Sequence, residues 1–148
     1  MTDCIFCKII ANDIPSFTVY EDEDIKAFLD ISQTTPGHTL VIPKKHVANI
    51  FEYDQALASK VFAKIPMIAS AIKVSNPDIQ GMNIVNNNGE LAYQSVFHSH
   101  FHLIPRYSTK DTFKMSFKDN SKKYTSEQLE SIMTSIKNEI GENNVKNI

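Results

Sequence analysis

Short apolar runs, bounded by turn residues, recur along the chain and predict β-strands. Two of them, at residues 17–20 and 25–29, flank an acidic turn and therefore suggest a hairpin. A third run, 38–42, follows a proline and glycine pair and is ended by Pro43. Two more runs, at 81–85 and 101–106, are joined by a polar loop. The pattern thus predicts five strands.

Two other segments have helical spacing. Between residues 54 and 74 apolar side chains recur every three or four positions, as expected for one buried helical face. A second apolar stripe follows Thr125, which begins a capping-box pattern, and Gly141 is expected to end that helix near residue 140, with a frayed tail after it. Residues 110–123 alternate apolar residues with lysines and suggest an irregular segment or an edge strand.

Length and charge limit the classes of protein that fit. A chain of 148 residues suits one domain, and we expect a core over residues 4–107 with a C-terminal extension carrying the helix at 125–140. A net charge of −2 argues against a broad basic surface, so no nucleic-acid partner is expected. No apolar run approaches the roughly 18 residues of a membrane span, and the expected location is the cytoplasm.

Three of the five histidines lie within five residues, at His98, His100 and His102. In a β-strand these alternate positions would place all three rings on one side. Imidazole can act as nucleophile, proton carrier or metal ligand near neutral pH. The simplest interpretation makes His100 a nucleophile that its two neighbours position. The alternatives are three half-exposed histidines on a strand, or a bare metal site.

Residues 94–104 closely resemble the histidine-triad signature of the HIT superfamily, in its Hint-like branch. Three further segments support the resemblance in the expected order: 29–32, 38–46 and 87–89. The resemblance implies an α+β, HIT-like fold with a mainly antiparallel five-stranded sheet, and usually a homodimer. It also implies a purine-nucleotide substrate and chemistry at the α-phosphorus.

The resemblance further implies a role for each matching residue. His100 would attack phosphorus to form a nucleotidyl-histidine that water resolves. Ser95 would face the leaving group, and His102 and His38 would hydrogen-bond phosphate oxygens or neighbouring rings. The nucleotide-binding residues would be Asp30 at the ribose, Phe28 and Ile31 at the base, Asn87 at the phosphate, and the loop backbone of Gln94, Ser95 and Val96. No motif for a catalytic Mg²⁺ carboxylate pair is present in the sequence.

Two positions depart from the family pattern. Tyr93 stands where the family typically has glycine, and a side chain there could narrow the leaving-group side or alter a backbone torsion that glycine makes easy. Ser99 replaces a larger apolar residue, a change expected to affect packing more than chemistry.

The two cysteines, Cys4 and Cys7, have a spacing that can grip one tetrahedral metal ion, but they supply only half of a site. Two free buried thiols are the alternative. Resemblance to bacterial zinc-containing members implies that His46 and His98 complete the site. It would then hold a structural Zn²⁺, with His98 bracing His100.

Several functions remain possible at this point. The leading hypothesis is hydrolysis of nucleoside 5′-phosphoramidates, in which a P–N bond is split and a mononucleotide is released. A dinucleoside polyphosphate hydrolase would use the same nucleophile with another leaving group. A non-catalytic nucleotide-sensing interaction protein comes from a different class. A purely zinc-structural interaction module ranks last because it leaves His100, His102 and His38 unexplained.

Overall fold

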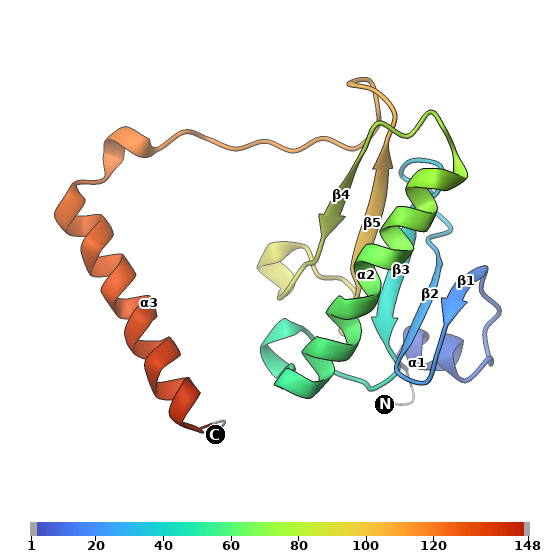
Figure 1. Ribbon diagram of the computed structural model, residues 1–148, viewed down its shortest axis with the longest axis horizontal. Coiled ribbons are helices and arrows are strands. Elements are labelled where there is room, and N and C mark those ends of the chain that lie inside the picture. The colour runs from blue at the N-terminus through green and yellow to red at the C-terminus, as the bar shows by residue number, and fades with distance from the viewer. Residues whose placement is uncertain (1–2, 147–148) are drawn as a thin grey trace. The chain divides into compact units, whose positions relative to one another are not determined.

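In the computed structural model, residues 3–146 are described, and side chains are described as far as residue 141. The chain divides into two compact units, the first ending at Lys114 and the second beginning at Met115 (Figure 1). The first unit contains an antiparallel sheet and two α-helices. This unit contains residues 4–107, the segment that the sequence analysis separates from the C-terminal extension.

The five strands confirm the predicted α+β fold with an antiparallel sheet. They are β1 (Thr18–Glu21), β2 (Ile25–Leu29), β3 (Thr39–Pro43), β4 (Gly81–Val85) and β5 (Phe101–Arg106). Their order in the sheet is β1-β2-β3-β5-β4, and every neighbouring pair is antiparallel. Each predicted strand is observed within one residue of its expected bounds. Short 3-10 helices occupy Ile50–Glu52 and Glu90–Ala92.

Alternation along the strands sends odd-numbered and even-numbered side chains to opposite faces of the sheet. On one face, odd-numbered residues such as Ala27, Val41 and Leu103 pack with the long helix α2 (Gln55–Ser75). On the other face, Phe28 and Leu40 pack with the short helix α1 (Ile5–Ile10). His102 lies in β5 at an even-numbered position and therefore belongs to the α1 face, and the ring of His100, just before β5, stands against Phe6 of α1.

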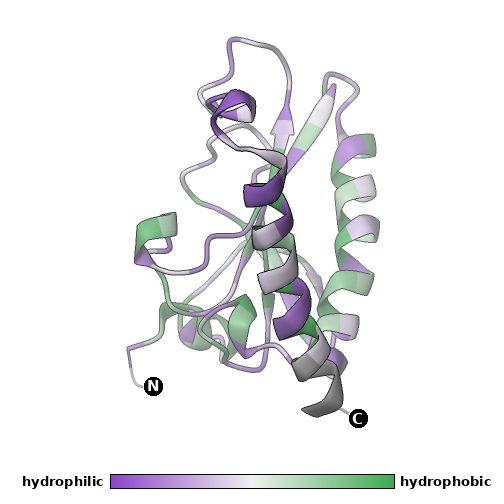
Figure 2. Cartoon of the chain, turned by 90° about the vertical axis from the view of Figure 1, so that its left-hand side faces the viewer, coloured by the Kyte–Doolittle hydropathy of each residue, from purple (hydrophilic) through white to green (hydrophobic). Residues whose placement is uncertain are grey.

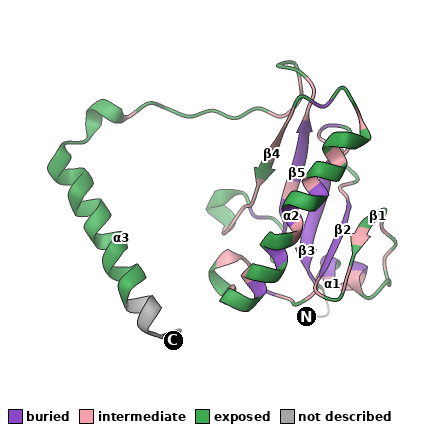
Figure 3. Ribbon diagram, viewed as in Figure 1, coloured by how far each residue is buried: buried purple, intermediate pink, exposed green. Residues whose placement is uncertain are grey.

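Helix α2 forms where the sequence predicts it. Asp54 caps its N-terminus, accepting a hydrogen bond from the backbone N–H of Leu57 at 2.7 Å. The side chains buried along it are Leu57, Val61, Ile65 and Ile68. Burying one such side chain stabilises the fold by about 1.5–3 kcal/mol, so this stripe holds the helix on the sheet (Figure 3).

Helix α1 has only six residues, too few to be stable by itself. Phe6 and Ile9 bury its apolar face, and the Sγ of Cys4 accepts a hydrogen bond from the N–H of Cys7 at 3.2 Å. At its other end, the ammonium of Lys26 donates to the backbone oxygen of Ile9 and to Oδ1 of Asn12, both at 3.2 Å. Lys26 is only 2% exposed, so its side chain serves to hold α1 against the sheet.

The second unit contains α3 (Ser126–Lys146), preceded by a 3-10 turn at Ser121–Lys123. The predicted capping box is confirmed: Thr125 Oγ1 accepts from the N–H of Gln128 at 3.2 Å, and Gln128 Oε1 accepts from the N–H of Thr125 at 2.9 Å. The predicted end at Gly141 is wrong, because one glycine weakens a helix without breaking it. The expected frayed tail is therefore helical as far as residue 146, and its last two residues lie outside the described range.

The segment before α3 is irregular, with no strand between residues 107 and 125. Polar and apolar residues alternate along α3 (Figure 2), and its predicted apolar stripe is about half exposed, with Leu129 at 53% and Ile136 at 57%. In the described part of the chain, no helix is both long and apolar enough to cross a membrane.

Candidate active site and metal centre

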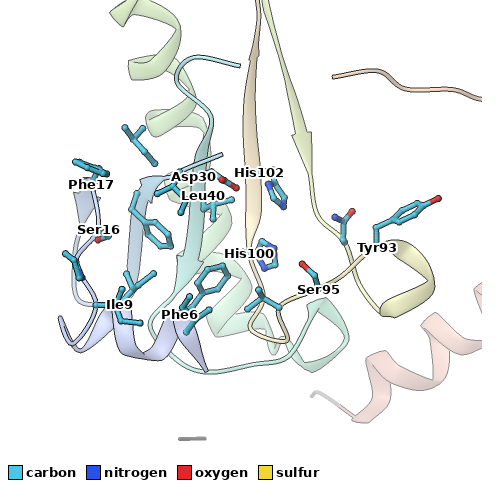
Figure 4. A pocket seen from close by; sticks show the side chains of 18 residues that line it. Phe6, Ile9, Ser16, Phe17, Asp30, Leu40, Tyr93, Ser95, His100 and His102 are labelled. Carbon is cyan, nitrogen blue, oxygen red and sulfur yellow. The ribbon is translucent and has the colours of Figure 1, made fainter. Parts of the chain in front are cut away.

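A cavity of about 440 Å³ opens on the α1 face of the sheet (Figure 4). Its two halves differ in chemistry. One half is apolar and is made by α1, by the chain entering β1 and by β2 and β3; among its residues are Ile5, Phe6, Ile9, Ile14, Pro15, Phe17, Phe28, Ile31 and Leu40. The other half holds the polar groups Asn87, Ser95, His100 and His102. Such an arrangement suits a ligand with an apolar ring at one end and a polar group at the other.

His100 is held in one tautomer. Its Nδ1 lies 2.8 Å from the backbone oxygen of His98. Because a carbonyl oxygen can only accept, Nδ1 carries the proton, and the lone pair is on Nε2. In the described part of the chain no group hydrogen-bonds to Nε2. The ring is 6% exposed and stands edge-on to Phe6 at 5.1 Å, and burial lowers the pKa of His100, which keeps it neutral near pH 7.

His38 and His102 form a directed chain of hydrogen bonds. The N–H of Thr34 donates to Nδ1 of His38 at 3.3 Å, which leaves the proton of His38 on Nε2. That nitrogen donates to Nδ1 of His102 at 2.9 Å, so His102 carries its own proton on Nε2. Burial first, then the proximity of His100 and His38, lowers the pKa of His102 to about 4. Burial also lowers the pKa of His38, against an opposing effect of Asp30.

Asp30 lies at the end of β2, on the same face as His38. Its Oδ1 accepts hydrogen bonds from the N–H and Oγ of Ser32 at 2.8 and 2.6 Å, and its Oδ2 lies 3.8 Å from Nε2 of His38. Burial acts to raise the pKa of Asp30, but the hydrogen bonds from Ser32 outweigh it and the pKa is lowered. Asp30 is therefore a carboxylate at neutral pH. Gln33 holds this turn together, donating to the backbone oxygens of Asp30 and His38 at 2.6 and 2.7 Å.

The loop after β4 contains residues that line the cavity and one residue, Gln94, that supports the loop. Asn87, Ser95 and Val96, three of the residues expected to bind nucleotide, line the cavity. Gln94 does not line it: the side chain is 3% exposed and bridges three backbone segments. Its Oε1 accepts from the N–H of Gly89 at 2.8 Å, and its Nε2 donates to the oxygens of Ala48 and Val96 at 2.6 and 3.1 Å.

His98 faces away from this cavity. Strand β5 begins only at Phe101, so of the three histidines only His102 lies in it, and alternation does not carry His98 to the pocket side. Its Nδ1 instead lies 3.4 Å from Sγ of Cys4 and 3.5 Å from Sγ of Cys7. Nδ1 of His46 is 3.3 Å from Sγ of Cys7 and 3.2 Å from Nδ1 of His98. The four expected metal-binding residues are thus brought together.

The chemistry of these four side chains fits a metal ion. Nε2 of His98 lies 2.8 Å from the backbone oxygen of Pro43 and must donate to it, which leaves the lone pair on Nδ1, toward the thiols. The four ligand atoms lie within 4.8 Å of one another. In a tetrahedral site with two sulfur and two nitrogen ligands, neighbouring ligand atoms are separated by about 3.3–3.8 Å. Cys4, Cys7, His46 and His98 could therefore hold one ion with no open position.

Comparison with known proteins identifies this arrangement. The family model described as the HIT domain matches residues 11–109, well over half of the chain. The chain belongs to the HIT family. It is 54% identical over 134 residues to the Protein hit of Bacillus subtilis (strain 168), covering 90% of this chain and 92% of that one. It is 41% identical over 107 residues to adenosine 5′-monophosphoramidase HNT1 of Saccharomyces cerevisiae, covering 72% of this chain and 65% of that one.

Solved structures of HIT proteins share the fold. A HIT family member from Bacillus subtilis superposes with a TM-score of 0.89 at 53% identity, covering 92% of this chain and 96% of that one. A Zn-bound histidine triad family protein from Mycobacterium smegmatis superposes with a TM-score of 0.71 at 32% identity, covering 93% and 97%. The HIT-like fold expected from the sequence is thereby confirmed.

Some residues of the site were not predicted from the sequence. Phe6 and Ile9 of α1 form part of the cavity wall, although α1 lies far from the histidines in the sequence. Asn86, beside the predicted Asn87, donates from Nδ2 to the backbone oxygen of His100 at 2.9 Å. The apolar residues next to the cysteines were a usable signal for α1, since the expected metal ion would bring that segment to His98. Nothing in the sequence distinguishes Asn86 from a turn residue.

Proposed function

We propose that this HIT protein hydrolyses purine nucleoside 5′-phosphoramidates, with His100 as the nucleophile. The observation that carries the proposal is the lone pair of His100 Nε2, which has no hydrogen bond within the described residues, while Nδ1 is held on the oxygen of His98. A neutral imidazole that cannot change tautomer is a ready nucleophile. The name of the yeast relative, adenosine 5′-monophosphoramidase, supports the same reaction.

The reaction proceeds in two displacements at phosphorus. Nε2 of His100 bonds to the α-phosphorus while the P–N bond breaks, and the amine leaves after its nitrogen takes a proton from solvent. Water then attacks the nucleotidyl-histidine: its oxygen bonds to phosphorus, the bond to Nε2 breaks and one proton returns to solvent, giving the mononucleotide and neutral His100. Two easier steps replace one difficult one. Ser95, on the cavity wall, is assigned to the leaving-group side.

The neighbouring groups bind and orient the substrate. We assign the N–H of His102 Nε2 to a phosphate oxygen, with His38 fixing the tautomer that makes this donation possible. We assign Asp30 to the ribose hydroxyls and Phe28 and Ile31 to the base, since they lie together on the cavity wall. Asn87 and the backbone of Ser95 and Val96 are assigned to the phosphate. Gln94 acts here by holding the loop, through its three hydrogen bonds.

We also propose that Cys4, Cys7, His46 and His98 bind a structural Zn²⁺. Two thiolates and two imidazoles with near-tetrahedral spacing form a ligand set typical of zinc. The Zn-bound relative supports this choice of metal. When bound, the ion supplies a cross-link between α1 and the loop that carries His98. Two free thiols suit a reducing compartment, so we propose that the protein is cytoplasmic.

A homodimer is part of the proposal. Strand β4 lies at one edge of the sheet, and its residue Ile84 is 54% exposed. The apolar stripe of α3 adds further exposed hydrophobic surface. Exposed apolar residues that follow one another along one helix face, as on α3, are typical of an interaction site. Sedimentation equilibrium measures the subunit number, and a monomer at micromolar concentration would contradict this part.

The proposed reaction is tested by comparing substrates and trapping the intermediate. The wild-type protein should release AMP from adenosine 5′-phosphoramidate faster than from a dinucleoside polyphosphate. A rapidly quenched reaction should carry one nucleotidyl group on His100, detected by mass spectrometry. His100→Asn should lower kcat by about a thousandfold or more and abolish the label. Faster cleavage of the polyphosphate would reverse the leaving-group assignment, and tight binding without turnover would favour a nucleotide sensor.

A further inference from the structure

Tyr93 has a backbone conformation that its side chain disfavours. Its φ and ψ are 66° and 20°, in the left-handed region, where residues other than glycine are uncommon. The resemblance noted above places glycine at this position in the family. In this chain a large aromatic side chain occupies a torsion that glycine adopts without cost. Strained positions of this kind cluster at functional sites.

The ring of Tyr93 is also unusually exposed. It is 87% exposed, although aromatic rings are normally buried for much of their surface. Its neighbour Leu91 is 99% exposed, but only Tyr93 lines the cavity, together with Asn87, Ser95 and His100. In Figure 4 Tyr93 lies beyond His100 and Ser95, on the far side from Phe6, Ile9 and Phe17. The ring therefore stands at the end of the cavity opposite the apolar half.

The loop that carries Tyr93 is well braced. The N–H of Tyr93 donates to the oxygen of Glu90 at 3.0 Å, and the N–H of Gln94 donates to the oxygen of Gly89 at 3.1 Å. The buried side chain of Gln94 fastens the same loop to Ala48. A ring on a fixed backbone has only two side-chain torsions to order, so a ligand pays little entropy to use it.

We propose that Tyr93 is a specificity-determining residue that stacks against a planar ring carried by the leaving group. The inference rests on the proposed function, in which the base fills the apolar half beside Phe28 and the ribose lies at Asp30. The leaving group must then lie at the end formed by Ser95 and Tyr93. An exposed aromatic face at that end recognises a flat, apolar ring, such as that of an arylalkyl amine.

The test uses two adenosine 5′-phosphoramidates that differ only in the ring of the amine, one made from 2-phenylethylamine and one from 2-cyclohexylethylamine. In the wild-type protein kcat/KM should favour the phenyl compound by about three- to tenfold, as expected for one aromatic pair. Tyr93→Phe should retain the preference, and Tyr93→Leu should reduce the ratio to near one. Leu91→Ala is the matched control on the same loop and should leave the ratio unchanged.

Several results would overturn the proposal. A wild-type ratio near one, or a ratio that survives Tyr93→Leu, would remove the stacking role. If Tyr93→Leu instead changed the sedimentation coefficient and left the ratio intact, the ring would belong to a subunit contact. The same ratio can be measured as Kd values in the His100→Asn background. A lack of turnover would therefore count against the proposed reaction alone, and the binding ratio would still decide the role of Tyr93.

Discussion

The backbone oxygen of His98 lies 2.8 Å from Nδ1 of His100, while the ring of the same His98 faces the thiols of Cys4 and Cys7. One residue therefore belongs to both sites: its main chain fixes the tautomer of the proposed nucleophile, and its side chain is a candidate metal ligand. Phe6 makes a second link, because its ring stands edge-on to both His98 and His100. A change at the candidate metal site should therefore alter the position of His100 and Phe6 in the cavity.

Metal removal should therefore weaken nucleotide binding. The purified protein is expected to contain about one equivalent of zinc, as measured by inductively coupled plasma mass spectrometry. Chelation or Cys4→Ser should lower Tm by on the order of 10 °C, because α1 loses a cross-link that its own six residues cannot replace. The affinity for AMP, measured by calorimetry, should fall at least about fivefold, although Cys4 does not line the nucleotide cavity.

Asp13→Asn is the control for this experiment, since Asp13 follows the same helix and is exposed. It should leave Tm, zinc content and affinity as they are in the wild type. Zinc far below one equivalent, together with a Cys4→Ser protein of unchanged stability, would show that the four residues have no metal-binding role.

Gln94 should contribute mainly to the stability of the fold rather than to direct contact with the nucleotide. Gln94→Ala leaves the N–H of Gly89 and the oxygens of Ala48 and Val96, which are partly buried, without their partner. The expected loss is about 2–4 kcal/mol in the free energy of unfolding, measured with urea. An Ala variant with wild-type stability but a raised KM would instead indicate direct contact between this side chain and the nucleotide.

Much of the fold follows from local patterns in the sequence. The apolar runs locate all five strands within one residue, and the stripe from Leu57 to Ile68 locates α2. The metal cluster was predicted from the spacing of two cysteines together with a resemblance, which supplied His46 and His98. The strand and helix predictions succeed because periodicity depends on neighbouring residues alone, whereas His46 and His98, far from the cysteines in the sequence, followed only from the resemblance.

Other features depend on contacts between distant parts of the chain and were missed. The nucleotide cavity takes much of its apolar wall from α1, a position set by Lys26, by the thiols and by packing on Phe28. Only the backbone of Gln94 was expected near the phosphate, and nothing in the sequence indicated that its side chain bridges Gly89, Ala48 and Val96. The error at Gly141 has a local cause instead, because one glycine weakens a helix without ending it, and α3 continues past this residue.

Asp30→Asn should weaken recognition of the ribose. The carboxylate already holds Ser32 through Oδ1, and a charged acceptor contributes more to a hydrogen bond than a neutral amide. The wild-type protein should bind AMP about 10- to 100-fold more tightly than 2′,3′-dideoxy-AMP, as measured by calorimetry. In Asp30→Asn this difference should shrink to a few fold. An unchanged difference would mean that the ribose hydroxyls lie elsewhere.

Acid should destabilise the protein through His102. Its pKa is about 4 in the folded state and 6.5 when unperturbed, so between these values the unfolded chain binds more protons. Stability is then complete above pH 6.5 and is lost as the pH falls toward 4. Allowing for partial solvent exposure, His102 should account for about 2 kcal/mol of that loss, or roughly 5 °C in Tm between pH 7.5 and 4.5.

His102→Gln is the informative variant, because its amide oxygen can still accept the hydrogen bond from Nε2 of His38. It should be less sensitive to acid than the wild type, with the difference appearing between pH 6.5 and 4.5. The two proteins differ only at residue 102, so comparing their Tm profiles measures the contribution of His102. Parallel profiles over this range would mean that His102 is protonated as readily in the folded protein as in the unfolded chain.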